Sequence, residues 1–322
     1  MKILVTGAAG FIGSHLIPRL LSHGHTVTAL VRHNATCSDN GKRRLVNLEA
    51  IEAQKPRDLR IIRCENTHGL ASALRGCNAE LCVHLAGRSW VRESIGWPEL
   101  YVEANYRYTV ALAQALSAAG CQRIVFASTV MVYGKDAPLP YAENQLGSFP
   151  SSPYGASKLA CEALLNTYRA LGKLEVINLR LFSVYGPELR QDLVPHLIAT
   201  AIMKGKPFTV FGDGSSIRDY IEIEDALNAI EAACNVPEVH ATLNVGSGFG
   251  TSVLELVHLI ENALSKKAEL VYKPAIEGEL AVAIPDISLA MSVLKWEPAV
   301  SVESGMARMA GWFQSNIDRI GK

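Results

Sequence analysis

The chain opens with Met1-Lys2-Ile3-Leu4-Val5-Thr6-Gly7-Ala8-Ala9-Gly10-Phe11-Ile12-Gly13, and this stretch decides its fold. The first six residues have the pattern of a short apolar strand, and an amphipathic helical pattern begins near Phe11. Gly7, Gly10 and Gly13 allow a tight turn and a close backbone approach to a pyrophosphate, and the unpaired N–H groups at a helix start attract phosphate. The strand-to-helix context predicts a dinucleotide-binding turn.

Strand and helix patterns alternate through the first half of the chain. The strands end near Thr6, Val31, Arg63, Leu85 and Ser128, and a further strand covers residues 175–181. This alternation predicts an α/β fold with a Rossmann-type, doubly wound parallel sheet covered on both faces. After Gly186-Pro187 the expected elements are helices over 193–203, 225–234, 253–264 and 302–313 and a strand over 207–211. We expect a dinucleotide-binding domain over 1–180 and a smaller α/β substrate lobe over 181–322, with an approximate boundary and interleaved lobes.

The run Tyr154-Gly155-Ala156-Ser157-Lys158 places a phenol and an ammonium one helical turn apart. A free tyrosine has a pKa of about 10, so a base for neutral pH needs that pKa lowered by roughly three units. A nearby positive charge lowers it, and residues i and i+4 share a helix face. The spacing by itself is common on surface helices. Downstream of a dinucleotide-binding turn, it predicts a catalytic base, Tyr154, assisted by Lys158.

A threonine follows the fifth expected strand. Residues 123–128 have the pattern of a buried strand, and Thr129 stands at its carboxyl end, where open α/β sheets bind their ligands. We therefore expect Thr129 to hydrogen-bond the substrate oxygen that Tyr154 contacts. The alternative is a threonine that only ends the strand.

The second strand ends in Val31-Arg32-His33, where dinucleotide-binding folds often carry an acid that binds the adenosine ribose. Without that acid, Arg32 could attract a 2′-phosphate. The alternatives are a solvated loop arginine and an arginine stacked on adenine. The sequence predicts NAD as cofactor and keeps NADP(H) open.

Taken together, these residues resemble the extended short-chain dehydrogenase/reductases, and within them the nucleotide-sugar epimerase/dehydratase family whose best-known members are UDP-glucose 4-epimerases. The resemblance covers nearly the whole chain. It includes His84-Leu85-Ala86-Gly87, Leu179-Arg180-Leu181-Phe182-Ser183-Val184-Tyr185-Gly186-Pro187, Arg218-Asp219-Tyr220-Ile221 and Leu294-Lys295-Trp296-Glu297-Pro298.

The resemblance implies roles for individual residues. Tyr154 would be the base, Lys158 its electrostatic partner and Thr129 the hydroxyl on the sugar C4 oxygen. The cofactor contacts it implies are Gly7, Gly10, Phe11, Ile12, Gly13, Arg32, Glu65, Asn66, Leu85, Ala86, Gly87, Asn105, Tyr154 and Lys158. The substrate contacts are Thr129, Ser183 and Arg218, the last one on the nucleotide diphosphate.

This chain departs from the family pattern at three places, one of which concerns the reaction and two the binding of the nucleotide diphosphate. Family dehydratases carry an Asp-Glu pair directly after the catalytic threonine, whereas this chain has Val130 and Met131, which disfavours dehydration. Ser183 stands where many epimerases have an asparagine. The family often has a second diphosphate-binding arginine in its C-terminal region, yet no arginine lies between Arg218 and Arg308.

The function these residues imply is a nucleotide-sugar 4-epimerase, acting on a UDP-hexose with tightly bound NAD. Tyr154 would take the C4 hydroxyl proton while the hydride leaves C4, and the 4-keto sugar would rotate and receive the hydride on its other face. The alternative is an NADPH-dependent reductase of a 4-keto nucleotide sugar. A non-catalytic dinucleotide sensor is a third hypothesis, disfavoured because such a sensor does not need the Tyr154/Lys158 pair.

Composition and charge limit the other classes of protein to which this chain could belong. The 322 residues are 49% hydrophobic with a formal net charge of zero, and no basic patch indicates nucleic acid. We expect a cytoplasmic protein, because no signal peptide precedes the first strand and no apolar stretch approaches the roughly 20 residues of a membrane span. Seven scattered cysteines indicate reduced thiols, and the nine histidines form no metal pattern. The helices expected over 98–119 and 153–171 have surplus apolar faces, and by resemblance to the family they predict a homodimer through a four-helix bundle.

Overall fold

The computed structural model describes residues 1–32, 39–64, 67–237, 241–275 and 280–316. Its contacts divide the chain into two compact units. The first unit comprises residues 1–134, 147–180 and 230–243, and the second comprises 135–146, 181–229 and the described residues from 244 onward. Each unit therefore draws on segments that lie far apart in the sequence.

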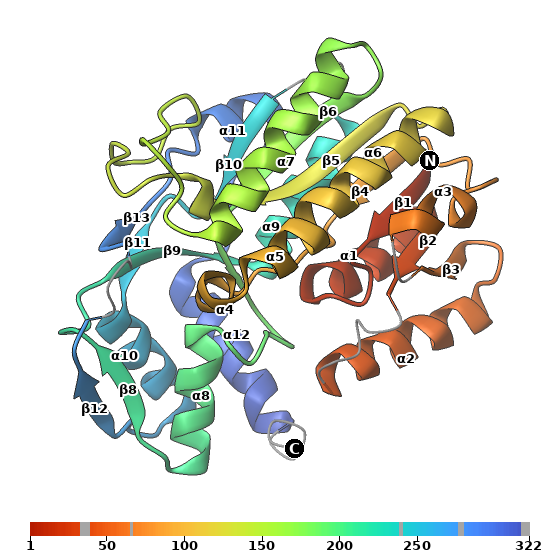
Figure 1. Cartoon of the computed structure of the whole chain (residues 1–322). Helices are drawn as coiled ribbons and strands as arrows, with labels where there is room; N and C mark the ends of the chain where they lie inside the picture. The colour runs from red at the N-terminus through yellow and green to blue at the C-terminus, as the bar shows by residue number, and fades with distance from the viewer. Residues whose placement is uncertain (33–38, 65–66, 238–240, 276–279, 317–322) are drawn as a thin grey trace. The chain divides into compact units, whose positions relative to one another are not determined.

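A seven-stranded sheet forms the centre of the first unit, with the strand order β10-β6-β5-β4-β1-β2-β3 (Figure 1). The strands are β1 (Lys2–Thr6), β2 (Thr26–Val31), β3 (Leu59–Arg63), β4 (Leu81–His84), β5 (Arg123–Thr129), β6 (Glu175–Leu181) and β10 (Ala241–Val245). Strand β1 pairs in parallel with β2 and β4, and the pairs β2–β3 and β4–β5 are also parallel. The predicted doubly wound α/β fold is confirmed, and the order reverses between β1 and β4, where such sheets bind ligands.

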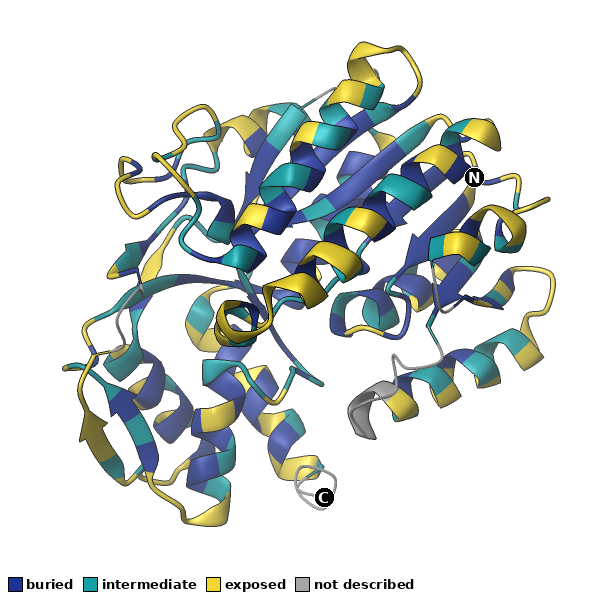
Figure 2. Cartoon of the chain, viewed as in Figure 1, coloured by how far each residue is buried: buried dark blue, intermediate teal, exposed yellow. Residues whose placement is uncertain are grey.

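Helices cover both faces of this sheet because its strands are apolar on both sides. They are α1 (Phe11–Ser22), α2 (Asp39–Gln54), α3 (Leu70–Ala73), α4 (Val91–Gly96), α5 (Pro98–Tyr101), α6 (Tyr108–Ala118) and α7 (Pro153–Ala170). Helices α6 and α7 lie side by side over one face of the sheet (Figure 1). Figure 2 shows the strands dark blue beneath them, and Leu4, Cys82 and Ile124 at the sheet centre are fully buried.

The helix expected over 98–119 contains a π-helical turn, η3 (Val102–Arg107), between α5 and α6. Such turns often mark functional sites. Buried Asn105 lies in this turn and bonds to the backbone of Arg88 and to Ser157 Oγ. Sequence periodicity did not predict the turn, because its tertiary contacts come from two other elements.

The second unit contains the shorter elements expected after Gly186. Strands β7 (Ser183–Tyr185), β11 (Gly250–Ser252) and β13 (Val282–Ala283) pair with β9 (Ile217–Glu222), and β8 (Phe208–Phe211) pairs with β12 (Leu270–Lys273). The helices are α8 (Val194–Lys204), α10 (Val253–Leu264), α11 (Ser288–Leu294) and α12 (Val302–Ser315), while α9 (Ile223–Asn235) continues into the first unit. Helix α10 starts with a capping box formed by Ser252 and Glu255.

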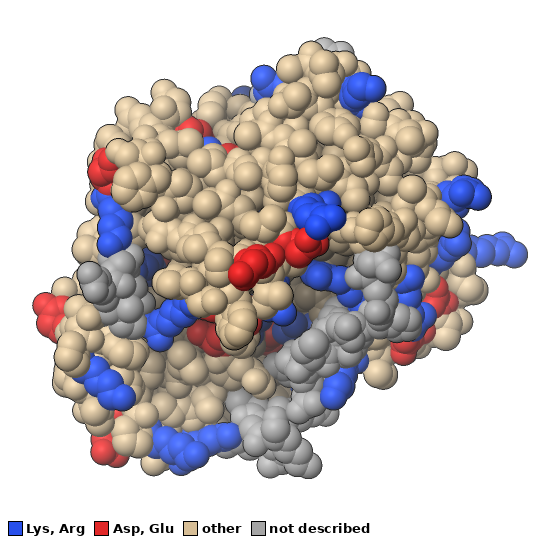
Figure 3. Space-filling view, in the orientation of Figure 1, with Lys and Arg blue, Asp and Glu red and all other residues tan. Residues whose placement is uncertain are grey.

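The described residues contain free cysteines, no cluster of potential metal ligands and no helix suited to cross a membrane. Cys37 lies outside the described residues; the other six cysteines are free thiols, and all but Cys77 are buried. Within the described ranges, no His, Cys, Asp and Glu side chains cluster as three or more potential metal ligands. No helix among the described residues combines the length and hydropathy that a membrane crossing requires. On the face shown in Figure 3, acidic and basic side chains are interspersed, and few lie over α6 and α7.

Candidate active site

The glycine turn is built without room for side chains. Gly7 has a φ of +68°, and a Cβ there would lie 2.8 Å from Ala86 N. A Cβ on Gly13 would lie 2.5 Å from Gly7 O, and one on Gly10 would lie 2.9 Å from the same oxygen. The turn therefore needs glycine at all three predicted positions, and it rests directly on the backbone that follows β4.

The start of α1 has the features of a phosphate site. Gly10 is the N-cap of α1, and within the described part of the chain no side chain caps this end. The first N–H groups of the helix and its dipole therefore favour an anion, as a dinucleotide pyrophosphate requires. Phe11 is buried and Ile12 half-buried in the same turn. These residues fit the pyrophosphate of NAD.

A buried polar chain ties this turn to β4 and η3. Thr6 Oγ1 accepts a hydrogen bond from Ala86 N (3.1 Å) and lies 2.7 Å from His84 Nδ1, while His84 Nε2 lies 3.0 Å from Thr109 Oγ1. Since Thr109 donates its proton to Asn105 O (2.7 Å), it accepts from Nε2–H, and Thr6 donates to Nδ1. Burial holds the pKa of His84 well below 6.5, so the ring stays neutral.

Lys158 is fixed at the carboxyl end of β5. It is only 4% exposed, and its Nζ donates to Ala127 O (2.7 Å) and lies 4.4 Å from the centre of the Phe126 ring. Burial lowers its pKa to about 8. A Cβ on Gly87 would lie 3.5 Å from Nζ, so the absence of a side chain at Gly87 keeps space open beside the ammonium. The predicted pair is thus anchored at the edge of the sheet where the cofactor turn lies.

Tyr154 and Thr129 come from elements packed closely against each other. Tyr154, in the first turn of α7, is 7% exposed, and Thr129 is 6% exposed at the end of β5. Thr129 caps the short helix η4 (Val130–Val132) by accepting from Met131 N (3.3 Å). Next to Tyr154, a Cβ on Gly155 would lie only 2.0 Å from Met131 O. The glycine lets the start of α7 reach the segment that carries Thr129.

A buried ion pair lies one helical turn beyond Lys158. Glu162 binds Arg180 of β6 through both carboxylate oxygens, with N–O distances of 3.1 Å and 2.8 Å, and both side chains are 4% exposed. Glu162 also accepts a hydrogen bond from Ser128, next to Thr129. Arg180 donates to Tyr133 Oη (3.0 Å) and lies over its ring. Lys158 and Glu162 therefore both fasten α7 to the end of β5.

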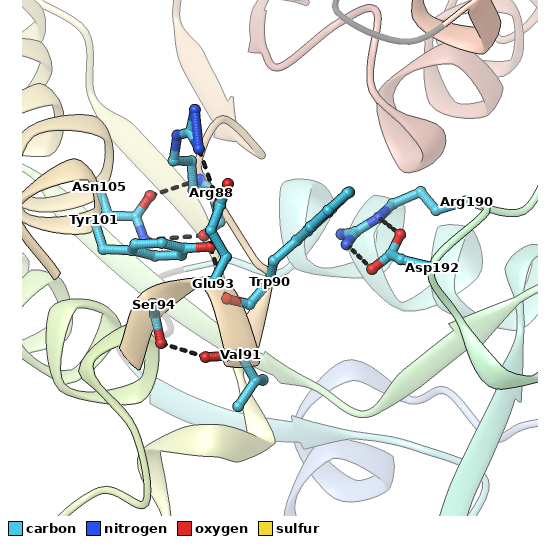
Figure 4. Close-up of polar contacts among 9 residues, drawn as sticks. All are labelled: Arg88, Trp90, Val91, Glu93, Ser94, Tyr101, Asn105, Arg190 and Asp192. Carbon is cyan, nitrogen blue, oxygen red and sulfur yellow. Dashed lines mark hydrogen bonds and ion pairs between the residues drawn. The ribbon is translucent and has the colours of Figure 1, made fainter. Parts of the chain in front are cut away.

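A second polar cluster surrounds Tyr101 (Figure 4), whose ring packs against Tyr154. The Tyr101 ring is fully buried and packs edge-on against the Tyr154 ring, with centres 6.1 Å apart. The Tyr101 hydroxyl lies 2.6 Å from Glu93 Oε2 and 2.7 Å from Trp90 O, and Glu93 binds Arg88 at 2.9 Å. Burial, and then the bond to Glu93, raises the pKa of Tyr101, while its hydroxyl and Arg88 lower the pKa of Glu93.

Asn105 closes this cluster. Its Oδ1 accepts from Arg88 N (2.7 Å), and its Nδ2 donates to Arg88 O (3.0 Å) and Ser157 Oγ (2.9 Å). Both amide hydrogens are therefore used inside the protein. The sequence placed Asn105 among the cofactor contacts; the structure shows it holding the segment after Gly87 against α7, and a direct cofactor contact stays a prediction.

At the end of β2, where the sequence predicts the adenosine contact, Arg32 is half-buried, with its guanidinium 5.7 Å from the centre of the Tyr108 ring. Arg44 of α2 is 4% exposed and lies 5.8 Å from the centre of the Phe11 ring. Glu65 and Asn66, which were expected to contact adenine, lie outside the described residues. Leu85 donates its N–H to Thr6 O (3.3 Å), so Leu85 and Ala86 border the glycine turn, and their contacts to the cofactor stay predictions.

Ser183 and Arg218 lie in the second unit on neighbouring strands. Ser183 of β7 pairs with Tyr220 of β9, two residues beyond Arg218. Arg218 is half-buried, and its Nη1 donates to Ile217 O (2.8 Å). Next to it, Asp219 accepts from Ser247 N and Ser247 Oγ, both at 2.8 Å, and burial raises its pKa to about 6. One sheet of this unit thus holds both predicted substrate residues.

Sequence reasoning missed the residues that support the predicted catalytic ones, namely His84, Glu93, Tyr101, Glu162 and Arg180. A signal existed for Glu162, because Tyr154, Lys158 and Glu162 follow at intervals of four on one helix face. Glu93 and Tyr101 gave no comparable signal. Their pairing depends on how α4 and α5 fold back on each other.

The fold and the site define a dinucleotide-binding enzyme of the short-chain dehydrogenase/reductase type. Residues 3–246 match the model of the NAD dependent epimerase/dehydratase family. The chain belongs to this family, as its motifs predicted.

Relatives and solved structures cover nearly the whole chain. The UDP-glucuronate 4-epimerase of Thermodesulfobacterium geofontis is 32% identical, with 98% of this chain and 97% of that protein covered. The UDP-glucose 4-epimerase of Mycolicibacterium smegmatis is 34% identical, with 98% and 99% covered. The structure of UDP-glucuronic acid 4-epimerase from Bacillus cereus, in complex with UDP-glucuronic acid and NAD, superposes with a TM-score of 0.89 at 30% identity, covering 98% of this chain and 99% of that one.

Proposed function

We propose that this chain is a nucleotide-sugar 4-epimerase that acts on a UDP-hexose with bound NAD. The observation that carries the proposal is the buried Lys158 ammonium, which Ala127 O holds one helical turn from Tyr154 and beside Gly87. The similarity to 4-epimerases of UDP-glucose and UDP-glucuronate, and to a complex that contains NAD, supports it.

Each catalytic residue has a distinct task in this proposal. Tyr154, as phenolate, takes the proton of the sugar C4 hydroxyl and returns it at the end of the reaction, while the Lys158 ammonium stabilises the phenolate charge. Thr129 already accepts from Met131 N and keeps its own O–H to donate to the C4 oxygen. The chemistry that bound NAD supplies here is reversible acceptance of the C4 hydride. Configuration at C4 changes without net oxidation.

We assign the nucleotide diphosphate to Arg218 and Ser183. A guanidinium can bind a diphosphate through two parallel hydrogen bonds, and a serine hydroxyl can donate one more. Both residues lie on neighbouring strands of one sheet, which supports their action on one group. Val130 and Met131 after Thr129 favour epimerisation over dehydration, because neither side chain can transfer a proton.

The test is turnover of UDP-glucose and UDP-glucuronate by the purified protein without added cofactor, with the C4 epimers separated by chromatography. Epimer formation is the expected result, and NAD should be released when the protein is denatured. Tyr154→Phe should lose activity by several orders of magnitude. Tyr168→Phe, the same change on a half-buried tyrosine of α7, is the matched control. An active Tyr154→Phe protein would refute the assigned base.

A second candidate is a reductase of a 4-keto nucleotide sugar that uses NADPH. The feature that favours it is Arg32 at the end of β2, stacked on Tyr108 with no acid beside it in Val31-Arg32-His33. NADPH consumed in equal amount with the 4-keto substrate would select the reductase. A dissociation constant for NAD far below that for NADP would remove it.

We also propose a homodimer through α6 and α7. Their partly exposed apolar positions include the half-buried Val110, Leu159 and Leu164 and the exposed Ala163. Figure 2 colours parts of both helices teal and yellow, and few charged side chains lie over them in Figure 3. Pairing the two helices with those of a second copy would bury this surface in a four-helix bundle. A monomer mass from light scattering at micromolar concentration would reject the dimer.

A further inference from the structure

The Tyr154 phenol has a second tyrosine beside it. The ring centres of Tyr101 and Tyr154 are 6.1 Å apart at an interplanar angle of 65°, which is the edge-to-face arrangement that aromatic pairs prefer. Tyr101 is fully buried, so its ring is part of the wall against which the catalytic ring rests. The rotamer of Tyr154 therefore depends on where Tyr101 is held.

Glu93 holds Tyr101 by its hydroxyl. The Tyr101 Oη to Glu93 Oε2 distance is 2.6 Å, typical of a phenol that donates to a carboxylate. Arg88 Nη1 binds the same carboxylate oxygen at 2.9 Å, so the charge of Glu93 is matched and its position is fixed from two sides. This contact also gives the two phenols different protonation behaviour. Tyr101 keeps its proton because Glu93 accepts it in a hydrogen bond, whereas Tyr154 shares a helix face with the Lys158 ammonium.

The contacts close into a ring that includes Tyr154, and Figure 4 shows its section from Tyr101 through Glu93 and Arg88 to Asn105. Arg88 is fastened through its backbone N and O to the Asn105 side chain, which donates to Ser157 Oγ. Ser157 precedes Lys158, and its hydroxyl donates to Tyr154 O (2.8 Å). The path therefore runs from the Tyr154 ring through Tyr101, Glu93, Arg88, Asn105 and Ser157 back to the Tyr154 backbone.

We propose that Glu93 and Tyr101 are positioning residues of the reaction: Glu93 anchors the Tyr101 hydroxyl, and the Tyr101 ring holds the Tyr154 phenol in its reactive orientation. Neither residue transfers a proton to the substrate. The inference rests on the proposed function in taking Tyr154 as the base, and it adds the means by which that base is aimed.

Kinetics of graded variants test the proposal. Tyr101→Leu removes the ring and should lower kcat about 100-fold, the scale expected for a base displaced by about 1 Å, with KM within about twofold of the wild type. Tyr101→Phe keeps the ring, so its kcat should be about tenfold higher than that of Tyr101→Leu. Glu93→Gln keeps an oxygen that can accept the Tyr101 proton and should stay within about threefold of the wild type. Glu93→Ala leaves Trp90 O as the remaining acceptor of that proton, so it should lose less of kcat than Tyr101→Phe.

Glu103→Gln is the matched control. Glu103 lies two residues after Tyr101 and pairs with Arg107 on the surface, where both side chains are more than half exposed, so kcat should not change. NAD binding, followed by fluorescence titration, should be unchanged in all variants. A Tyr101→Leu protein with kcat within threefold of the wild type would overturn the proposal, as would losses of kcat and NAD affinity in equal proportion, which indicate a general structural defect.

A second measurement separates this proposal from the assigned activity. Nitration of Tyr154 by tetranitromethane, quantified by mass spectrometry of its peptide, reports access to the phenol without any turnover. Tyr101→Leu should speed this nitration at least threefold, and Glu103→Gln should leave it unchanged. If the wild type epimerises no sugar nucleotide but nitration responds as expected, the activity is wrong and the positioning stands. If epimerisation occurs and nitration does not respond, the positioning is wrong.

Discussion

Replacing Gly155 by alanine should damage the active site more than the fold. The added Cβ would lie 2.0 Å from Met131 O, 2.8 Å from Met131 C and 3.2 Å from Pro150 Cβ. Carbon–oxygen contacts in proteins begin near about 3.3 Å, so the start of α7 and the η4 segment must separate by about 1.3 Å. Tyr154 is the neighbouring residue on α7, and Thr129 caps η4. The substitution therefore pulls the proposed base away from the hydroxyl that shares its substrate oxygen.

The two consequences can be estimated separately. Overpacking costs about 1–3 kcal/mol, and alanine returns up to about 1 kcal/mol through its higher helix propensity. The net destabilisation of about 1–2 kcal/mol should lower Tm by roughly 2–5 °C. A displacement of about 1 Å at the reacting groups costs about 100-fold in rate. The Gly155→Ala protein should therefore fold and bind NAD, yet lose about 99% of kcat.

The assay combines kcat for epimerisation, NAD affinity and Tm from calorimetry. The control is Gly311→Ala in α12, where, among the described residues and apart from the helix's own backbone and the two chain neighbours, no atom lies within 4 Å of the added Cβ. It should leave kcat unchanged and stabilise the protein by up to about 1 kcal/mol. A Gly155→Ala protein that keeps kcat within threefold of the wild type would contradict this prediction, because the backbone contact would then not set the position of Tyr154.

Three further predictions follow from buried charges and from the second unit. Glu162→Ala strands the buried Arg180 guanidinium and should destabilise the protein by about 3–5 kcal/mol, whereas the double change Glu162→Met with Arg180→Leu should cost far less in denaturant unfolding. Lys158 has its pKa lowered to about 8 in the fold, while an unfolded lysine titrates near about 10.4. Between about pH 8 and about pH 10.4, Lys158 keeps its proton in the unfolded chain but has lost it in the folded chain. The contribution of Lys158 to stability should therefore rise over this pH range, and Lys158→Met should abolish that rise in unfolding titrations. Arg218→Met should weaken UDP binding by about 10–100-fold in calorimetry without changing NAD affinity, since a charged hydrogen bond contributes about 1.5–3 kcal/mol.

Each of these predictions has an outcome that contradicts it. If Glu162→Ala and the double change lower the free energy of unfolding equally, the ion pair itself is required for stability. An unchanged pH profile in Lys158→Met would show that another group causes the rise. UDP affinity that survives the loss of Arg218 would remove this arginine from the diphosphate site.

The sequence by itself determined the glycine turn, the alternation of β1 to β6 with helices, and the placement of Tyr154 and Lys158 on one helix face. These features are local, because a turn needs particular residues at adjacent positions and a helix repeats every 3.6 residues. Tyr154 and Lys158 can be placed on one helix face without knowledge of the rest of the fold.

Only the tertiary structure decided what these residues contact. Lys158 Nζ is fixed by Ala127 O, 31 positions earlier, and Glu162 meets Arg180 across two elements. Strand β10 joins the sheet from the second half of the chain, and Tyr101 meets Tyr154 only because α5 packs against α7. Such pairs have no fixed spacing in the sequence. Their geometry is set by how the apolar faces of the helices and strands pack against one another, and this packing is a property of the whole fold.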